Sequence, residues 1–190
     1  MRLRVIAGEF RSRLLKSVPG LETRPTPDRL REALFNVLTP VIEDSVFVDA
    51  YAGTGAVGIE ALSRGAKRAI FVERNRAAVG VIRDNLGALG IADRAEVFTG
   101  KAAPVLERVT ADIVFLDPPY ALVKDYTESL GILGVRSVGL VIVQHAHRQA
   151  LDEEYGTLRR SRILRQGDNA LSFYGVNATD SPHLPKLHPV

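Results

Sequence analysis

The strongest constraint on the fold is an alternation of short apolar segments with helical segments that begins near Ser45. Most of the apolar segments lack polar positions, as expected for strands that are buried on both faces. Repeated strand–helix units predict a parallel sheet that is covered by helices on both sides. The expected strands are residues 46–50, 68–73, 94–98, 112–117 and 138–144, and the expected helices are residues 57–63, 75–90, 102–108 and 124–133.

Both ends of the chain depart from this alternation. Residues 2–18 are expected to form two short strands around a turn at Gly8. A helix should follow, capped by Thr26, with Pro27 in its first turn and an end near Leu38. Residues 157–165 and 170–176 predict an antiparallel hairpin. We therefore expect a basic N-terminal hairpin and helix in residues 1–40, an α/β domain in residues 41–176 and a flexible tail in residues 177–190.

The composition excludes several classes of chemistry. The chain has no cysteine, which removes disulfides, cysteine-bound zinc, iron–sulfur clusters and a thiolate nucleophile. Its four histidines do not share a metal-binding spacing, so no metal site is expected. The apolar runs are far shorter than the ~20 residues of a membrane span, and the first residues lack the apolar core of a secretion signal. We expect a cytoplasmic protein without membrane or metal partners.

The basic residues are concentrated at the N-terminus. Residues 1–31 contain eight basic and three acidic residues, so the remaining 159 residues contain 17 basic and 19 acidic ones. Seven of the eight are arginines, which suit bidentate contacts with phosphate. A polyanionic partner such as RNA and a solvated surface hairpin both fit this charge. The candidate RNA-binding residues are Arg4, Arg11, Arg13, Lys16, Arg24 and Arg29.

A glycine-rich loop follows the first expected strand. The segment from Asp49 to Gly58 contains G-x-G-x-x-G between a strand and a helix, which is the context of a nucleotide site. Glu73 ends the next strand 20 residues after Gly53, where a carboxylate can bind two ribose hydroxyls. Nicotinamide dehydrogenases share this pattern. Asp49, however, would repel a pyrophosphate, whereas it suits the cationic methionine part of S-adenosylmethionine.

The tetrapeptide Asp-Pro-Pro-Tyr, which begins at Asp117, follows the fourth expected strand. Ligands of open α/β sheets bind beyond the carboxyl ends of the strands, so Asp117 should lie beside the glycine loop if strands one and four are neighbours. The Asp117 carboxylate and the Pro118 carbonyl can accept hydrogen bonds from an exocyclic amino group, and Tyr120 can stack on the base. These residues suit N-methylation of an unstacked base. Without a thiol, the chain cannot use the covalent route to carbon-5 of a pyrimidine.

Together these segments resemble the bacterial 16S rRNA guanine-N2 methyltransferases of the RsmD type. The resemblance covers about residues 2–176 and is carried most specifically by Arg-Pro-Thr-Pro-Asp-Arg-Leu-Arg-Glu-Ala-Leu-Phe-Asn, from Arg24 to Asn36. It implies an α/β, Rossmann-like, seven-stranded S-adenosylmethionine-dependent fold with an N-terminal β-hairpin. It further implies methyl transfer to one guanine of 16S rRNA, in the 30S subunit or its assembly intermediate, by an enzyme that we expect to be a monomer.

The resemblance also implies roles for single residues. The basic N-terminal residues would contact rRNA phosphates, and Arg24 and Thr26 would lie near the mouth of the active site. The target guanine would be held by the catalytic residues Asp117, Pro118, Pro119 and Tyr120. The cofactor S-adenosylmethionine would be held by Asp49, Tyr51, Gly53, Gly55, Glu73 and Lys101.

Three positions are not explained by the resemblance. Lys101 stands where related enzymes often have Asp or Asn beside the adenine, so backbone groups or water would have to accept from the adenine amino group. Gln144 stands where many relatives have an acidic residue, and we assign it no role. Glu60 is either a helix-surface acid or a group that orders the N-terminal block by pairing with an arginine.

Two other functions fit part of this pattern. The tetrapeptide would suit a DNA adenine- or cytosine-N methyltransferase, although 190 residues leave no room for a target-recognition domain. A non-catalytic RNA-binding assembly factor would explain the basic arm. Such a factor would have no need of Asp117 or Tyr120 beside a glycine loop.

Overall fold

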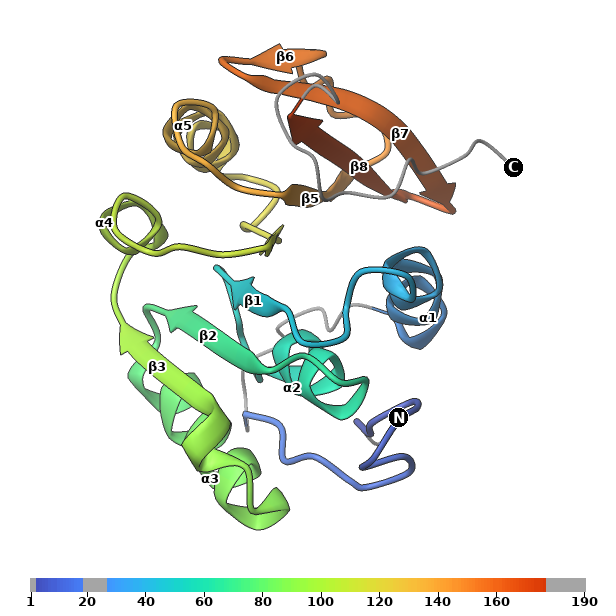
Figure 1. The fold of residues 1–190 in the computed structure, drawn as a ribbon, viewed down its shortest axis with the longest axis vertical. Helices are drawn as coiled ribbons and strands as arrows, with labels where there is room; N and C mark the ends of the chain where they lie inside the picture. Colours follow the sequence, from blue (N-terminus) through green and yellow to red (C-terminus); the bar gives the residue numbers. More distant parts are fainter. Residues whose placement is uncertain (1–2, 19–26, 177–190) are drawn as a thin grey trace.

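The computed structural model describes residues 3–18 and 27–176, and within them the chain forms one mixed sheet of eight strands. The strand order is β3-β2-β1-β4-β5-β8-β7-β6 (Figure 1). The first five strands in this order are parallel, and the last three are each antiparallel to the strand before them. The strands are β1 (Val46–Asp49), β2 (Arg68–Glu73), β3 (Ala95–Thr99), β4 (Ile113–Leu116), β5 (Leu140–Ala146), β6 (Glu154–Tyr155), β7 (Leu158–Gln166) and β8 (Asn169–Val176).

Helices cover both faces of the sheet. The helices are α1 (Asp28–Leu38), α2 (Ala56–Ser63), α3 (Arg76–Leu89), α4 (Ala102–Leu106) and α5 (Val123–Leu133), with a 3₁₀ turn at Ala92–Arg94. On one face, α1 and α2 pack with Phe47 and Phe115 of the sheet, and α3 packs beside α2 against Phe71. On the other face, α4 and α5 pack with Val114 and Val141. The buried side chains therefore form a three-layer core.

The predicted alternation and its parallel sheet are confirmed. β1 lies between β2 and β4, as expected for the first and fourth strands. The sheet has eight strands rather than the expected seven because β6 is added at the edge. β6 consists of two residues, which pair with Leu158 and Arg159. A segment of this length gives no periodic signal in a sequence.

The N-terminal segment doubles back around Gly8 as expected, with backbone hydrogen bonds from Val5 to Arg13 and from Leu15 to Leu3, but it forms no regular strands. Within residues 3–18, Arg4 and Leu14 form an isolated bridge and no strand is assigned. Gly8, at the turn, has a φ of +81°, and a Cβ added there would lie 1.9 Å from the Ser63 carbonyl oxygen. Only glycine fits this approach. The segment also packs on α2 and α3, so these further contacts depend on the folded helices.

Glu60 of α2 holds the N-terminal segment in place. Its carboxylate is fully buried and accepts hydrogen bonds from the backbone N–H groups of Ile6 (2.7 Å) and Ala7 (3.0 Å). It also accepts from Nε of Arg64, one turn further along the helix, at 2.7 Å. Glu60 therefore orders the N-terminal block through the backbone of Ile6 and Ala7, and the arginine that it pairs with, Arg64, immediately follows α2.

Helix α1 joins the N-terminal segment to the sheet. It begins at Asp28 and ends at Leu38, while its predicted cap, Thr26, lies outside the described residues, as does the tail from residue 177. Arg31 is fully buried, and its Nη2 donates to the Arg4 carbonyl oxygen (2.6 Å) and to Asp28 Oδ1 (3.1 Å). The leucines of α1 share one core with β1, β4, β5 and β8. Residues 27–38 thus pack as part of the sheet domain.

Candidate active site

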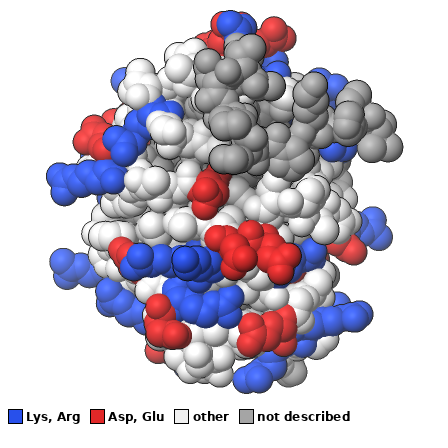
Figure 2. Space-filling view, in the orientation of Figure 1, with Lys and Arg blue, Asp and Glu red and all other residues white. Residues whose placement is uncertain are grey.

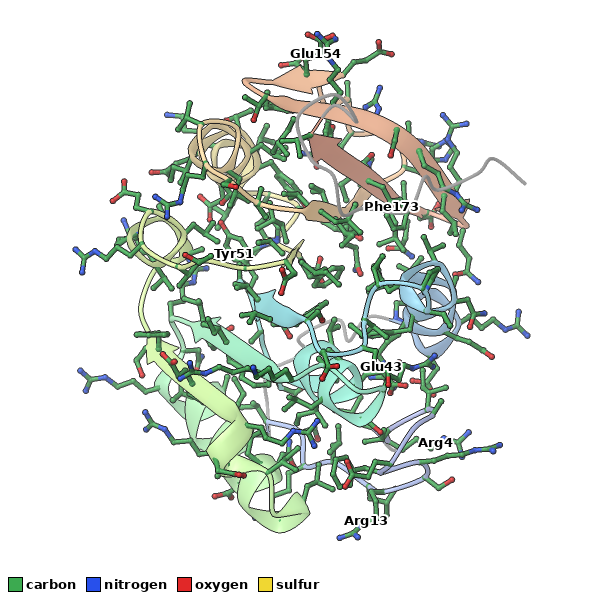
Figure 3. All side chains as sticks on the ribbon, viewed as in Figure 1. Arg4, Arg13, Glu43, Tyr51, Glu154 and Phe173 are labelled. Carbon is green, nitrogen blue, oxygen red and sulfur yellow. The ribbon has the colours of Figure 1, made fainter. Side chains whose placement is uncertain are left out.

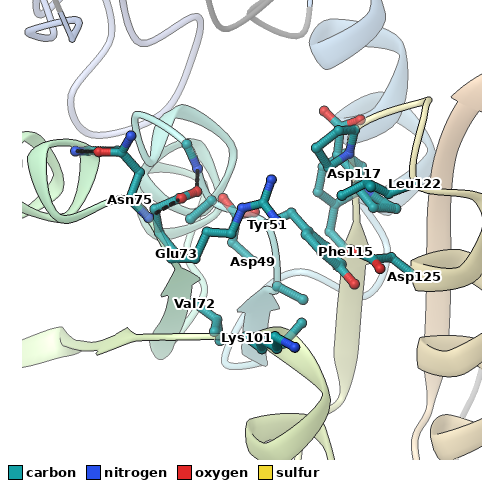
Figure 4. A pocket seen from close by; sticks show the side chains of 18 of the residues that line it. Asp49, Tyr51, Val72, Glu73, Asn75, Lys101, Phe115, Asp117, Leu122 and Asp125 are labelled. Carbon is teal, nitrogen blue, oxygen red and sulfur yellow. Dashed lines mark hydrogen bonds between the residues drawn. The ribbon is translucent and has the colours of Figure 1, made fainter. Parts of the chain in front are cut away.

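A cavity of about 670 Å³ opens beyond the carboxyl ends of β1 and β4 (Figure 4). Small-molecule sites commonly have volumes of about 300–1,000 Å³. The glycine loop after β1, Glu73 at the end of β2 and the tetrapeptide after β4 line the cavity together. The topology explains this, because the winding of the sheet reverses between β1 and β4 and the two following loops diverge.

Asp49 lies at the base of the cavity, at the end of β1. It is 1% exposed, and its Oδ2 accepts a hydrogen bond from the Gly58 N–H of α2 at 3.0 Å. Burial raises the pKa of Asp49 to about 7; the Gly58 hydrogen bond opposes this shift, and the Glu73 carboxylate adds to it. A cationic ligand group would stabilise the charged form. Asp49 is therefore suited to bind an ammonium group.

Glu73 fixes the glycine loop against the end of β2. Its Oε2 accepts from the Gly53 N–H at 2.9 Å, and its Oε1 accepts from the Asn75 N–H at 2.7 Å. An ionised carboxylate offers about four acceptor positions, so about two remain for ribose hydroxyls. Gly53 and Gly55 have positive φ angles of 54° and 78°, and Gly55 immediately precedes α2. These glycines turn the chain sharply from strand to helix.

Tyr51 and Lys101 line the same cavity (Figure 4). The Tyr51 hydroxyl lies 2.9 Å from Ser129 Oγ of α5, and burial raises the pKa of Tyr51. Lys101 is exposed and immediately precedes α4. The cavity is also bordered by Gly100, Ala102 and Ala103.

Two tyrosine hydroxyls hold the tetrapeptide in position. The Tyr126 hydroxyl, in α5, donates to the Pro118 carbonyl oxygen at 3.0 Å. The Tyr120 hydroxyl donates to Asn169 Oδ1, at the start of β8, at 2.7 Å. A carbonyl oxygen has two lone pairs, so the Pro118 carbonyl can accept one further hydrogen bond. The residues of the tetrapeptide that line the cavity are Asp117, Pro118, Pro119 and Tyr120.

Gln144 is a lining residue that sequence reasoning left without a role. It is 4% exposed, and its amide oxygen has no hydrogen-bond partner among the described residues. Its place follows from the strand register. Leu116 of β4 pairs with Val143 of β5, so Asp117, just after β4, lies beside Gln144, which is still within β5. Register across the sheet is the signal that could have found it.

The predicted RNA-binding residues do not gather around this cavity. Arg13 Nη2 donates to the Ala88 carbonyl oxygen, near the end of α3, at 3.4 Å. Because α2 and α3 both run away from the cavity, this places the tip of the N-terminal segment, with Arg11 and Arg13, at the opposite edge of the sheet. Figure 3 shows Arg4 and Arg13 beyond α2, away from Tyr51.

The other candidates in this group are also dispersed. Lys16 forms an exposed ion pair with Asp84 at 2.8 Å, and Arg29 is exposed on α1. Arg24 lies outside the described residues. On the face seen in Figure 2, basic and acidic side chains are interspersed rather than gathered in one basic patch. In residues 3–18 and 27–176, no group of three His, Asp or Glu side chains could hold a metal ion, and no helix is long and apolar enough to cross a membrane.

The sheet order and the cavity at its switch point are those of the S-adenosylmethionine-dependent methyltransferase fold. Within that class, the chain belongs to the family described as "Conserved hypothetical protein 95", whose model matches residues 3–175. The resemblance to the RsmD type is thereby confirmed.

Three similar proteins illustrate the relationship. The "Putative rRNA methyltransferase YlbH" of Bacillus subtilis is 32% identical over 186 residues, which cover 90% of this chain and 98% of the relative. The "Ribosomal RNA small subunit methyltransferase D" of Escherichia coli is 44% identical over 123 residues, 63% of this chain and 61% of the relative. The solved structure of "Putative methyltransferase yhhF" from Escherichia coli has a TM-score of 0.80 and 34% identity, and covers 93% of this chain and 98% of its own.

Proposed function

We propose that this chain transfers a methyl group from S-adenosylmethionine to the N2 amino group of a guanine in the 16S rRNA of the small ribosomal subunit. The proposal is carried by the tetrapeptide from Asp117 to Tyr120, which lines the same cavity as the glycine loop. The relative named as a small-subunit ribosomal RNA methyltransferase supports the choice of RNA. We expect the substrate to be the 30S subunit or an assembly intermediate, bound by a monomer.

The lining residues divide between two ligands. Asp49 would bind the ammonium group of the methionine part, and Glu73 would bind the ribose hydroxyls. The cofactor supplies an electrophilic methyl group on a positively charged sulfur. On the other side of the cavity, the Asp117 carboxylate and the Pro118 carbonyl would accept hydrogen bonds from the two amino N–H groups, while Tyr120 stacks on the base. This arrangement directs the nitrogen lone pair toward the methyl group.

Once the amino group and the methyl donor are bound in this way, the main task of the protein is to keep them aligned. The amino nitrogen displaces the sulfur directly, and alignment and electrostatics supply most of the rate. No strong general base is required, because the nitrogen readily loses its proton once it is alkylated. No covalent intermediate with the protein forms.

The test uses labelled S-adenosylmethionine with unmethylated 30S subunits, naked 16S rRNA and duplex DNA in parallel, followed by digestion to nucleosides. We expect label in N2-methylguanosine from 30S subunits or rRNA. Label in N6-methyladenine or N4-methylcytosine from DNA would show that the protein methylates an exocyclic amino group but that its substrate is DNA and not rRNA. Binding to rRNA without transfer of label to any acceptor would favour the non-catalytic assembly factor.

Replacement of Asp117 separates chemistry from cofactor binding. Because its carboxylate would hold the amino group and not the cofactor, Asp117→Ala should lower methyl transfer by about 10²–10³-fold. The dissociation constant of S-adenosylhomocysteine, measured by calorimetry, should change little. A parallel loss of cofactor affinity would show that this division of roles is wrong.

A further inference from the structure

The cavity itself does not attract a polyanion. The basic residues of its described lining are Arg74 and Lys101, and the acidic ones are Asp49, Glu73, Asp117, Asp125 and Glu128. An RNA strand would bring phosphates to both sides of a base that enters the cavity, and RNA binding depends on basic groups that meet those phosphates. The basic groups must therefore stand around the entrance.

The β7–β8 hairpin lies beside the tetrapeptide that lines the cavity. The hydrogen bond from the Tyr120 hydroxyl to Asn169 connects the tetrapeptide to the first residue of β8. Gln166 pairs with Asn169 across the hairpin, and the exposed Arg165 is the next residue back along β7. Arg165 thus lies at the end of the sheet where the parallel strands finish, which is the end onto which the cavity opens.

A second arginine comes from the turn after β5. The His147 N–H donates to the Asp168 carbonyl oxygen at 2.8 Å, which joins this turn to the β7–β8 turn. Arg148 is the next residue and is exposed. Arg148 and Arg165, hereafter the hairpin rim, therefore stand at the same end of the sheet, beside the tetrapeptide.

The hairpin rim differs from the arginines at the other end of β7. There, Arg159 pairs with Glu154, and Arg160 lies 3.5 Å from Glu153. Within the part of the chain that the structure describes, neither residue of the hairpin rim forms an ion pair. Among the described residues, β6 pairs only with Leu158 and Arg159, so β7 is an exposed edge at Arg165, and an arginine there can serve to prevent pairing with another chain. That explanation does not apply to Arg148, which lies in the turn after β5 and not on a strand.

We propose that the hairpin rim binds phosphates of the RNA strand that flank the target nucleotide. This inference rests on the proposed function, because it takes an RNA base as the occupant of the cavity. A guanidinium group matches two phosphate oxygens, and the absence of an acidic partner leaves its donors available. The rim would hold the strand across the entrance, so that the base beside Tyr120 can turn into the cavity.

The test compares the double variant Arg148→Gln/Arg165→Gln with Arg159→Gln, which removes a paired charge from the same hairpin. Binding to unmethylated 30S subunits is measured at a series of KCl concentrations, with S-adenosylhomocysteine present to prevent turnover. Each lost phosphate contact should reduce the slope of log affinity against log salt by about 0.7–0.9. The double variant should therefore lose about 1.4–1.8 of slope, and the Arg159→Gln control should lose none.

The outcomes separate the rim from the chemistry. An unchanged slope in the double variant, with normal transfer to guanine by the wild-type protein, would show that the hairpin rim does not bind phosphates and would leave the proposed function intact. Label in a DNA base from the wild-type protein would overturn both. If the double variant no longer binds S-adenosylhomocysteine and is therefore misfolded, the single variants Arg148→Gln and Arg165→Gln decide, and each should lose about 0.7–0.9 of slope.

Discussion

At the scale of single residues, the Asp49 carboxyl is set apart by its burial beneath the cavity. Burial raises the pKa of Asp49 to about 7, well above the value of about 4 that an unfolded chain would have. Between about pH 4 and pH 7 the native protein therefore holds a proton that the unfolded chain has lost. As the pH rises through this window, ionisation of the same carboxyl in the unfolded chain favours unfolding, so the ligand-free protein becomes less stable.

Ligand binding should have the opposite dependence on pH. Because a ligand ammonium group needs the ionised carboxylate, binding below pH 7 must release the Asp49 proton. We expect the affinity for S-adenosylhomocysteine to fall by up to about tenfold for each pH unit below about pH 7. Calorimetry from pH 5.5 to 8 measures this. Asp49→Asn should bind weakly at every pH, and a constant wild-type affinity would exclude the role assigned to Asp49.

The hydrogen bond between Tyr120 and Asn169 gives a second prediction at this scale. Tyr120→Phe keeps the stacking ring but frees its orientation, and Asn169→Leu removes the same bond from the other side. Each should lower kcat/KM for rRNA by about 2–10-fold. The double variant should be no worse than either single variant, because both changes remove one interaction.

A matched control separates this effect from general stability. The Tyr174 hydroxyl donates to the Asp152 carbonyl oxygen at 2.8 Å and does not line the cavity. Tyr174→Phe should therefore lower stability without changing kcat/KM. Asn169→Asp, which keeps the acceptor, should retain most of the activity. Additive losses in the Tyr120 and Asn169 variants would mean that the two residues act separately.

At the scale of elements, the attachment of the N-terminal segment to α2 depends on one buried carboxylate. Glu60→Gln replaces one acceptor oxygen with an N–H₂ group that faces a backbone N–H donor, and removes a negative charge near the buried Arg31. We expect a loss of about 3 kcal/mol in the free energy of unfolding. Denaturant titration measures this, and hydrogen exchange should show lost protection at Ile6 and Ala7.

Glu96 provides the comparison, because it forms an exposed ion pair with Arg68. Surface pairs contribute less than about 1 kcal/mol, so Glu96→Gln should have little effect. Equal losses in the two variants would show that burial of Glu60 is not what makes it important.

The elements that could be predicted from the sequence are those with a repeated pattern. The apolar strands and the glycine loop carry local signals, and the expected position of the loop next to the tetrapeptide followed from topology alone. The turn of the N-terminal segment at Gly8 could be predicted, but its attachment could not, because its partners Glu60, Ser63 and Asn85 are far along the chain on α2 and α3. Asn169 falls in the turn of the predicted hairpin, where asparagine is common. Its hydrogen bond to Tyr120 exists only once the hairpin packs beside the tetrapeptide.

Across the protein as a whole, the cavity lies at the carboxyl ends of the parallel strands, and the tip of the N-terminal segment lies at the opposite ends of these strands. Helix α3, which runs between these ends, has 14 residues and is therefore about 21 Å long. An RNA that contacts both must extend along the helical layer. We expect Arg11→Ala/Arg13→Ala to reduce the salt slope on 30S subunits by up to about 1.4–1.8, with no effect on a short stem-loop that carries the target guanine.

The two RNA substrates distinguish a long-range contact from a local one. Filter binding over a range of salt concentrations gives both slopes. If the variant loses slope on the stem-loop as well, the tip contacts RNA next to the target base. If it loses slope on neither substrate, the basic N-terminal segment is a solvated surface.

The attachment of the N-terminal segment also sets an order of events during synthesis. The Ile6 N–H donates to Glu60, which is 54 residues later in the chain, and the Lys16 N–H donates to Asn85, which is 69 residues later. Residues 3–18 leave the ribosome before α2 and α3, so they have none of this surface to bind until those helices have been made and folded. Contacts between such distant residues form slowly, so this segment is among the last parts of the fold to be ordered. Until then Val5 and Leu15, which end buried, are accessible to chaperones.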